Sequence, residues 1–484
     1  MFLGLDLGTS SLKAVLVRED GRVAAAHAVP LAVSRPAPGF AEQDPDSWWQ
    51  ALLAACDALR SGHPAALGAV RAIGLSGQMH GAVVLDSAGA VLRPCILWND
   101  VRAAAECDAL ERLLPSLAAV TGNRAMPGFT APKLLWLRRH EPDVFRRTAS
   151  VLLPKAWLRY RLCGELVEDM SDASGTLWLD VGRRDWSDAA LAATGLARAA
   201  MPRLVEGSAP AGTLHPALAL QWGMRSPVLI AGGAGDNAAG AVGLGAIRVG
   251  DAFVSLGTSG VVWATTDRFV PCPQAAVHAF CHALPGLWHQ MGVTLSAASC
   301  LAWWARVTGR REAALLREVP PPRAPSPVVF LPYLSGERTP HNDAGIRGAF
   351  AGLAHETERA ALTQAVLEGV AFSLRDCLDS LTASGTRVDS AAVIGGGSRS
   401  RLWLQILAAV LGIPLVRVAA GEHGAAVGAA RLARLALTGE APAQVCVTPP
   451  RLGTVMPDPA LTGPYAAAHA RYRALYPALK PASC

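Results

Sequence analysis

The sequence predicts an α/β protein built from two facing lobes. An apolar strand that ends in glycine and threonine occurs twice, as Phe-Leu-Gly-Leu-Asp-Leu-Gly-Thr-Ser at residues 2–10 and as Phe-Val-Ser-Leu-Gly-Thr-Ser-Gly at residues 253–260. The chain of 484 residues is too long for one hydrophobic core, and the repeat divides it into halves. We therefore expect an N-terminal lobe at residues 1–246 and a C-terminal lobe at residues 247–484.

The first half alternates strands and helices. The first strand leads into a returning strand, a turn at Gly21 and another strand, as in an antiparallel hairpin. In the helix at 46–60, apolar residues recur at helical spacing, and Asp46 or Ser47 can cap its start. After the first strand, we expect strands at 12–17, 22–32, 69–76 and 228–231, and helices at 46–60, 133–140 and 238–245.

The second half contains another strand with a glycine-rich end. Residues 391–394 are apolar and run into Gly395, Gly396 and Gly397, and a helix resumes at Leu402. A backbone with three consecutive glycines can approach an adenine ring or a ribose closely, although a tight turn is the alternative explanation. The proline-rich segment at 320–327 is interpreted as a structural surface loop.

The two repeated loops are candidate phosphate-binding sites. Glycine lets the backbone approach a ligand, and exposed amides and hydroxyls can donate hydrogen bonds to phosphate oxygens. The residues concerned are Gly8, Thr9, Ser10, Gly257 and Thr258. Two such loops on facing lobes indicate that the protein holds one nucleotide between them.

Asp6 distinguishes the first loop from the second, where Ser255 stands at the matching position. A carboxylate beside phosphates indicates magnesium, and we expect Asp6 to contact Mg²⁺ through water. A strand-end aspartate that only caps a turn is the alternative.

Asp236 is the strongest candidate for catalysis. It follows the buried strand at 228–231 and stands between Gly235 and Asn237. A carboxylate at such a strand end can accept the proton of a substrate hydroxyl that attacks phosphorus. A helix N-cap is the alternative role, but the two phosphate loops favour a general base.

Met79 and His80 lie in a glycine-bounded loop at 77–81, where the strand at 69–76 ends. Ligand groups in α/β sheets gather at such strand ends. Taken alone, a methionine is usually core and a histidine usually a satisfied polar residue. The loop makes both candidates for substrate binding.

Four further residues resemble a metal site by composition only. They are His278, Cys281, His282 and His289. Because their spacing matches no zinc pattern, we interpret them as structural.

The composition of the chain argues against a nucleic-acid-binding protein and against a membrane-spanning protein. The net charge of +6 is spread over a large chain without a basic run, so we expect no nucleic-acid partner. No stretch approaches the roughly 20 apolar residues of a membrane span, and the ten cysteines are scattered as in a reduced, cytoplasmic protein. The oligomeric state is left open, with a homodimer as one option.

Several motifs together resemble one family. They are Gly-Phe-Thr-Ala-Pro-Lys-Leu-Leu-Trp-Leu at 128–137, Gly-Gln-Met-His-Gly at 77–81, Leu-Trp-Asn-Asp at 97–100, Gly-Asp-Asn-Ala-Ala-Gly at 235–240 and Leu-Ser-Gly-Glu-Arg-Thr-Pro-His at 334–341. The set is similar to that of the FGGY carbohydrate kinases, and within them most similar to the bacterial members that act on xylulose. The resemblance runs nearly end to end.

The resemblance implies two ribonuclease-H-like lobes of the actin and hexokinase type, with a central ATP and sugar cleft. It implies ATP-dependent phosphorylation of D-xylulose to D-xylulose 5-phosphate, with Asp236 as base and Asp6 required at the phosphoryl centre. Sugar would bind to Met79, His80, Asp236 and Asn237, and ATP to Gly8-Thr9, Gly257-Thr258 and Gly396-Gly397.

Two segments depart from the family pattern. Ala361 stands where the second signature, at 348–368, usually has a polar residue, and residues 422–426 match only loosely. A sister kinase for ribulose or a pentitol is the nearer alternative, because few pocket contacts decide sugar choice. An actin- or chaperone-like ATPase is the more distant alternative. Such an ATPase does not need a general base that faces a sugar.

Overall fold

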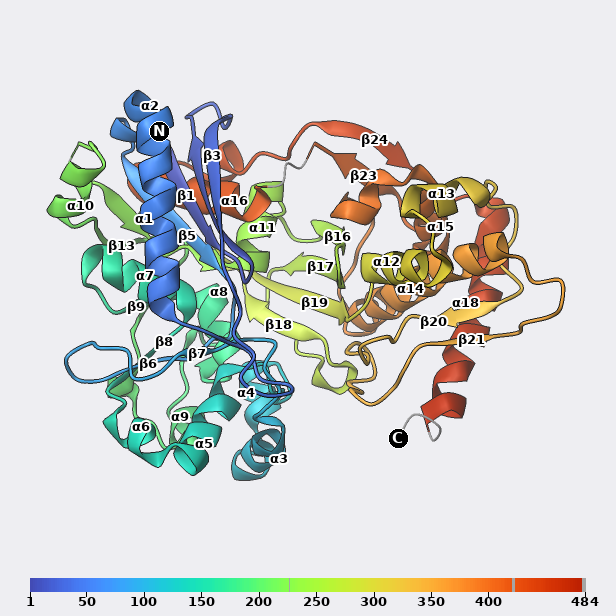
Figure 1. The fold of residues 1–484 in the computed structure, drawn as a ribbon, viewed down its shortest axis with the longest axis horizontal. Helices are drawn as coiled ribbons and strands as arrows, with labels where there is room; N and C mark the ends of the chain where they lie inside the picture. The colour runs from blue at the N-terminus through green and yellow to red at the C-terminus, as the bar shows by residue number, and fades with distance from the viewer. Residues whose placement is uncertain (226, 420–422, 481–484) are drawn as a thin grey trace.

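The computed structural model describes residues 1–225, 227–419 and 423–480. It contains two seven-stranded sheets, one in each half of the chain, and these form two lobes (Figure 1). Of the loosely matching segment at 422–426, residue 422 lies outside the described part, and Gly424 begins a helix.

The first sheet is built around β1 (Phe2–Leu7). This strand pairs antiparallel with β2 (Ser11–Val17) and parallel with β5 (Ala72–Gly77). The other strands are β3 (Val23–Pro30), β13 (Pro210–Thr213), β14 (Leu229–Ala231) and β15 (Ala234–Gly235), in the order β13-β14-β5-β1-β2-β3 with β15 beside β5.

The second sheet repeats this arrangement. Here β16 (Ala252–Leu256) pairs antiparallel with β17 (Gly260–Thr266) and parallel with β22 (Ala391–Ile394). The other strands are β18 (His278–Cys281), β19 (Trp288–Thr294), β23 (Leu415–Val418) and β24 (Arg451–Val455). In each sheet a run of antiparallel strands, three in the first sheet and four in the second, adjoins parallel ones, which confirms the predicted α/β fold with two related lobes.

Helices cover both faces of the first sheet. On one face, α1 (Pro45–Gly62) and α7 (Pro154–Cys163) bury Trp48 and Trp157 against the strands. The cap predicted for α1 was wrong. Asp44 caps it by accepting a hydrogen bond from the Asp46 amide, because Pro45 fits the first helical turn and extends the helix upstream.

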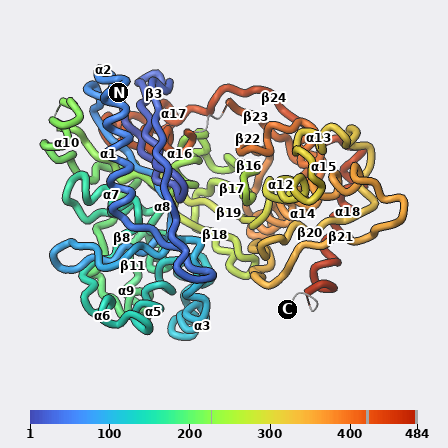
Figure 2. Tube along the Cα trace, in the orientation of Figure 1, coloured from blue at the N-terminus to red at the C-terminus, as the bar shows by residue number. Residues whose placement is uncertain are grey.

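The other face of the first sheet is covered by α16 (Gly424–Thr438), which packs along α11 (Asp236–Leu244). Figures 1 and 2 show α16 beside β1 and β5, although its residues follow those of β23. A Cβ on Gly4 would lie 1.8 Å from the carbonyl oxygen of Ala426. A helix from the second half therefore rests directly on the backbone of the first sheet.

The second sheet has a helical face and a face toward the first lobe. One hydrophobic cluster joins its helical face to α12 (Ala298–Thr308), α14 (Arg359–Ala383), α15 (Arg401–Leu411) and α18 (Pro459–Leu479), with α18 lying against α15. On the opposite face, Trp263 and Phe280 share a hydrophobic cluster with Phe129 of the first half. This shared cluster joins the two lobes.

The remaining elements are short and surround these two lobes. The helices are α2 (Pro64–Gly68), α3 (Ala104–Leu113), α4 (Leu117–Thr121), α5 (Thr130–His140), α6 (Pro142–Arg147), α8 (Met170–Ala173), α9 (Asp188–Thr194), α10 (Pro216–Gln221), α13 (Glu312–Glu318) and α17 (Pro442–Val445). The strands are β4 (Glu42–Gln43), β6 (Val83–Leu85), β7 (Cys95–Ile96), β8 (Ser150–Leu152), β9 (Val167–Asp169), β10 (Leu179–Asp180), β11 (Asp185–Trp186), β12 (Arg203–Val205), β20 (Val329–Leu331) and β21 (Ala349–Ala351).

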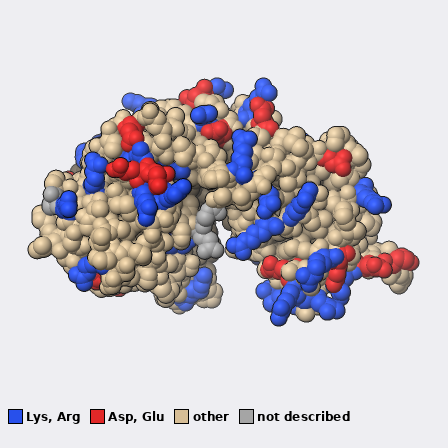
Figure 3. Space-filling model, turned by 90° about the horizontal axis from the view of Figure 1, so that it is seen from above, with Lys and Arg blue, Asp and Glu red and all other residues tan. Residues whose placement is uncertain are grey.

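Charges of both signs are interspersed on the face of the molecule shown in Figure 3. In the part of the chain that the structure describes, no helix has the length and apolar character that crossing a membrane requires.

Candidate active site

A cavity of about 300 Å³ lies between the two lobes. The first half supplies one wall, consisting of Met79, His80, Trp98, Asp236 and Asn237. The second half supplies the other wall, consisting of Ser255, Gly257, Ser259, Val261, His278, Met291, Val293 and Arg338. The structure thus gathers the four predicted sugar-binding residues at one place, beside the second glycine loop.

Asp236 is the first residue of α11, and Gly235 occupies the N-cap position. The carboxylate therefore does not serve as the helix cap. Its Oδ1 atom accepts hydrogen bonds from the backbone amide of Asn237 at 2.7 Å and from the Asn237 side-chain amide at 3.0 Å. These bonds fix the carboxylate at the cavity wall.

The protonation of Asp236 is tuned by its surroundings. Burial, and next the charge of Asp6, raise the pKa of Asp236 to about 6, while the hydrogen bonds from Asn237 act in the opposite direction. The carboxylate is therefore ionised at neutral pH with a pKa close to the working range, as a general base requires.

Asp6 lies in β1 and does not line the cavity itself. Its Oδ1 atom accepts a hydrogen bond of 3.0 Å from the Ser76 hydroxyl. Burial raises the pKa of Asp6, and the Ser76 hydrogen bond and the charge of Lys13 oppose that rise. Because its charge acts on Asp236, the two carboxylates belong to one electrostatic centre.

Met79 and His80 follow the end of β5, and two glycines make room for them. A Cβ on Gly235 would lie 2.8 Å from the Met79 sulfur, and one on Gly175 would lie 2.6 Å from His80 Nδ1. His80 Nδ1 donates a hydrogen bond of 2.7 Å to the Gly175 carbonyl, which leaves Nε2 as an acceptor. Burial lowers the pKa of His80 to about 3, so the ring is neutral.

The first glycine loop is tied to the wall of the cavity that the first half supplies. Thr9 Oγ1 donates to Gln78 Oε1 at 3.0 Å and accepts from Trp98 Nε1 at 2.9 Å, and the Gly8 amide donates to the Ser11 carbonyl at 3.0 Å. In this structure these donors bind protein rather than facing solvent. Ser10 is exposed.

The second glycine loop abuts the Gly395–Gly397 turn. Gly395 has φ 86°, and a Cβ there would lie 2.6 Å from the Leu256 carbonyl, just before Gly257. Thr258 and Gly396 are exposed, whereas Gly397 is buried against the side chains of Leu256 and Trp403. Only glycine permits this close approach of the two loops.

Trp98, His278 and Arg338 line the cavity but were not predicted as site residues. Trp98 and Arg338 belong to the motifs at 97–100 and 334–341, which served above only to indicate the family. Membership of these motifs is the feature of the sequence that could have identified both residues as part of the site. His278 was interpreted as structural. The structure places the other residues of that group differently, with His282 Nε2 near the Ala246 carbonyl and His289 stacked on Trp263.

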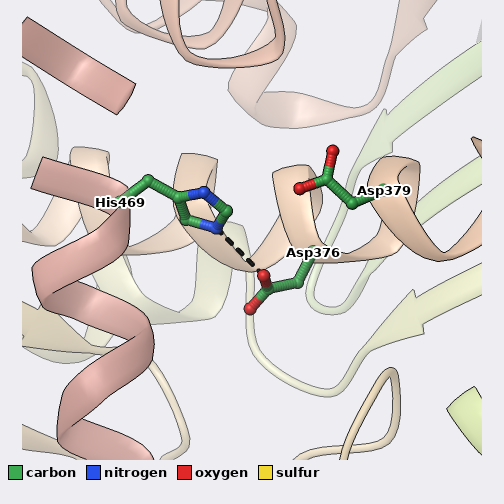
Figure 4. A group of neighbouring side chains, drawn as sticks. All are labelled: Asp376, Asp379 and His469. Carbon is green, nitrogen blue, oxygen red and sulfur yellow. Dashed lines mark hydrogen bonds and ion pairs between the residues drawn. The ribbon is translucent and has the colours of Figure 1, made fainter. Parts of the chain in front are cut away.

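A separate group of Asp376, Asp379 and His469 joins α14 to α18 (Figure 4). His469 Nε2 lies 2.9 Å from Asp376 Oδ1, and Arg375 Nε donates to Asp379 Oδ1 at 2.6 Å. Since the carboxylates have these partners already, the group is best explained as a contact that docks the C-terminal helix.

Comparison with known proteins identifies the family. The model of the FGGY carbohydrate kinase N-terminal domain matches residues 1–243, and that of the C-terminal domain matches residues 252–437. The chain belongs to the FGGY family of carbohydrate kinases. The predicted family is therefore confirmed.

Among FGGY kinases, the chain is 52% identical to the xylulose kinase of Escherichia coli K12, with 91% of each chain covered. It is 49% identical to the xylulose kinase of Klebsiella pneumoniae, with 99% of each covered. A crystal structure described as a "xyloylose kinase" from Brucella ovis superposes with a TM-score of 0.97 at 53% identity, over 99% of each chain.

Proposed function

We propose that this FGGY kinase transfers the γ-phosphoryl group of ATP to the terminal hydroxyl of D-xylulose, giving D-xylulose 5-phosphate and ADP. The observation that carries the proposal is the cavity in which Met79, His80 and Asn237 face the same space as Asp236, next to Gly257. Relatives named xylulose kinases, at 49% and 52% identity over nearly the whole chain, support this choice of sugar.

In this proposal Asp236 accepts the proton of the attacking hydroxyl. Its pKa of about 6 leaves it ionised before the reaction, and the developing alkoxide can then attack phosphorus. The hydrogen bonds from Asn237 hold the carboxylate still, which reduces the entropy lost on reaching the reactive geometry.

Asp6 fits a magnesium site. It is an oxygen donor of the kind that Mg²⁺ prefers, and Ser76 engages only one of its two oxygens among the described residues. Asp6 would hold Mg²⁺ through water, and the ion would neutralise phosphate charge when ATP is bound. Gly8, Thr9, Ser10, Gly257, Thr258, Gly396 and Gly397 are the residues that we propose for ATP.

We further propose a functional division at residues 246 and 247. Residues 1–246 would supply the sugar contacts and the base, and residues 247–484 would bind the nucleotide. The repeated sheets support this division, and the cavity lined from both halves supports closure of the lobes during the reaction.

A panel of acceptors tests the proposal. ADP release would be measured with D-xylulose, D-ribulose, xylitol or no sugar. We expect D-xylulose to give the highest kcat/KM and the sugar-free rate to be small. Preference for D-ribulose or xylitol would indicate a sister kinase, and ADP release that ignores every sugar would indicate an ATPase.

A further inference from the structure

Arg338 places a positive charge in the cavity, and although the charge of the adjacent Glu337 acts on it, the two side chains form no ion pair. Arg338 Nη1 lies 3.2 Å from His278 Nε2, and the guanidinium forms no ion pair with any residue that the structure describes. Burial lowers the pKa of Arg338, yet a guanidinium stays charged at any ordinary pH. A half-buried cation facing a cavity is stabilised by an oxygen that accepts its hydrogen bonds.

The neighbouring carboxylate of Glu337 is already satisfied by other donors. It accepts hydrogen bonds from the Thr294 hydroxyl at 2.6 Å and from the Ser373 hydroxyl at 2.9 Å. It also accepts from the backbone amides of Leu295 at 3.0 Å and Arg338 at 2.8 Å. The Arg338 guanidinium is not among these donors, so an oxygen of a ligand bound in the cavity can accept its hydrogen bonds.

The protein also fixes the direction of the guanidinium. The Asn123 side-chain amide donates to the Thr121 carbonyl, so its oxygen is the acceptor for His278 Nδ1 at 2.9 Å. The other ring nitrogen of His278 then accepts from Arg338. Next along the chain, the Thr339 amide donates to the Val293 carbonyl at 3.0 Å, which ties the loop to β19.

The chemistry of this wall selects one kind of oxygen. A guanidinium has five N–H donors and no acceptor, so the ligand oxygen must accept. A ketone carbonyl has only lone pairs to offer. A hydroxyl at the same place brings a hydrogen that Arg338 cannot accept, and a buried donor without a partner is costly. Asp236 meanwhile requires a hydroxyl at the other end of the sugar.

We propose that Arg338 binds the carbonyl oxygen of an open-chain ketose, and that this contact makes the enzyme select ketoses over pentitols. The inference rests on the proposed function and adds to it the residue that recognises the non-reacting end of the sugar.

The test compares D-xylulose with xylitol, which differs by a hydroxyl in place of the carbonyl. Arg338→Met is expected to raise the KM for D-xylulose about 10- to 100-fold, the range for a hydrogen bond to a charged group. The KM for ATP should stay within about twofold. The ratio of kcat/KM for D-xylulose to that for xylitol should fall at least about tenfold, and Arg338→Lys, which keeps the charge but loses the fork, should be intermediate.

Arg347→Met is the matched control. Arg347 follows in the same segment, but its guanidinium donates to the carbonyls of Ala344, Gly345 and Ile346 and does not line the cavity. The Arg347→Met variant should leave the ratio of kcat/KM for D-xylulose to that for xylitol unchanged. Melting temperatures of all variants show whether each is folded. If Arg338→Met does not fold, the comparison of Arg338→Lys with the wild type decides the role of Arg338.

Calorimetric binding of both sugars to the wild type and the Arg338 variants separates the two proposals. If Arg338→Met and Arg338→Lys are active and have the wild-type ratio of kcat/KM for D-xylulose to that for xylitol, the role of Arg338 is overturned. The proposed function then still stands. An enzyme that binds D-xylulose through Arg338 without phosphorylating it overturns the proposed function alone. A wild-type protein that binds neither sugar contradicts both.

Discussion

The buried side-chain nitrogen of Lys133, whose pKa burial lowers to about 7, donates a hydrogen bond of 2.8 Å to the carbonyl oxygen of His80. His80 has φ 71°, a left-handed conformation that costs free energy in a residue other than glycine. Lys133 also donates to the Gly128 carbonyl at 2.7 Å, and the Thr130 hydroxyl donates to His80 at 3.2 Å. The start of α5 therefore holds the loop that we propose for sugar binding in its strained shape.

Replacing Lys133 with Met should loosen this loop. We expect the KM for D-xylulose to rise about tenfold while the KM for ATP hardly changes, and stability to fall by about 1 to 3 kcal/mol because buried carbonyls lose a donor. Steady-state kinetics and thermal unfolding measure the two effects. A less stable enzyme with an unaltered KM for D-xylulose would limit Lys133 to a structural role.

Replacing His80 tests the sugar contact itself. His80→Asn is the better variant, because asparagine tolerates a positive φ that alanine does not. Loss of the Nε2 acceptor should weaken D-xylulose binding about 5- to 150-fold, the equivalent of about 1 to 3 kcal/mol. Calorimetry with sugar and nucleotide measures this, and equal sugar affinity in both proteins would contradict the contact.

The pH dependence of kcat/KM should report Asp236. A base with a pKa of about 6 is protonated below that pH, so kcat/KM should fall about tenfold per pH unit on the acid side and level off above about pH 7. Asn237 lowers the pKa of Asp236 through its side chain, so Asn237→Ala should move the acid limb to higher pH. A flat profile between pH 5 and 7 would exclude Asp236 as the titrating base.

Much of the fold could be predicted because local patterns decide it. The strand at 391–394 matches β22 residue for residue, since a short apolar run between Asp389-Ser390 and three glycines has few alternatives. The start of α1 could not be placed to the residue, because Asp44, Asp46 and Ser47 are all good caps and only the structure shows which one is used.

The site could be predicted only where a residue stands at a strand end. Asp236, Met79 and His80 follow strands and gather in the cavity. Arg338 and His278 reach it from a loop and a distant strand, so their meeting depends on tertiary structure. The placement of α16 on Gly4 likewise depends on a contact between residues far apart in sequence.

Closure of the lobes should couple the two substrates. The proposed ATP contacts lie on both lobes, and the cavity proposed for the sugar is lined from both lobes, so both ligands should favour one closed state and each should tighten the other by about 1 to 3 kcal/mol. Solution scattering with D-xylulose and a non-hydrolysable ATP analogue measures the change in radius of gyration. An unchanged radius, together with sugar affinity indifferent to nucleotide, would refute closure.

The role of Asp236 is tested most directly by the product that the wild type and Asp236→Asn form from D-xylulose and ATP. Phosphorus NMR should show D-xylulose 5-phosphate and ADP in equal amounts for the wild type. In Asp236→Asn the rate should fall about 100- to 10,000-fold, because the base is lost, while nucleotide affinity stays within about twofold. A different phosphorylated position, or a variant with near-normal turnover, would contradict the assignment of Asp236 as the base that activates the terminal hydroxyl.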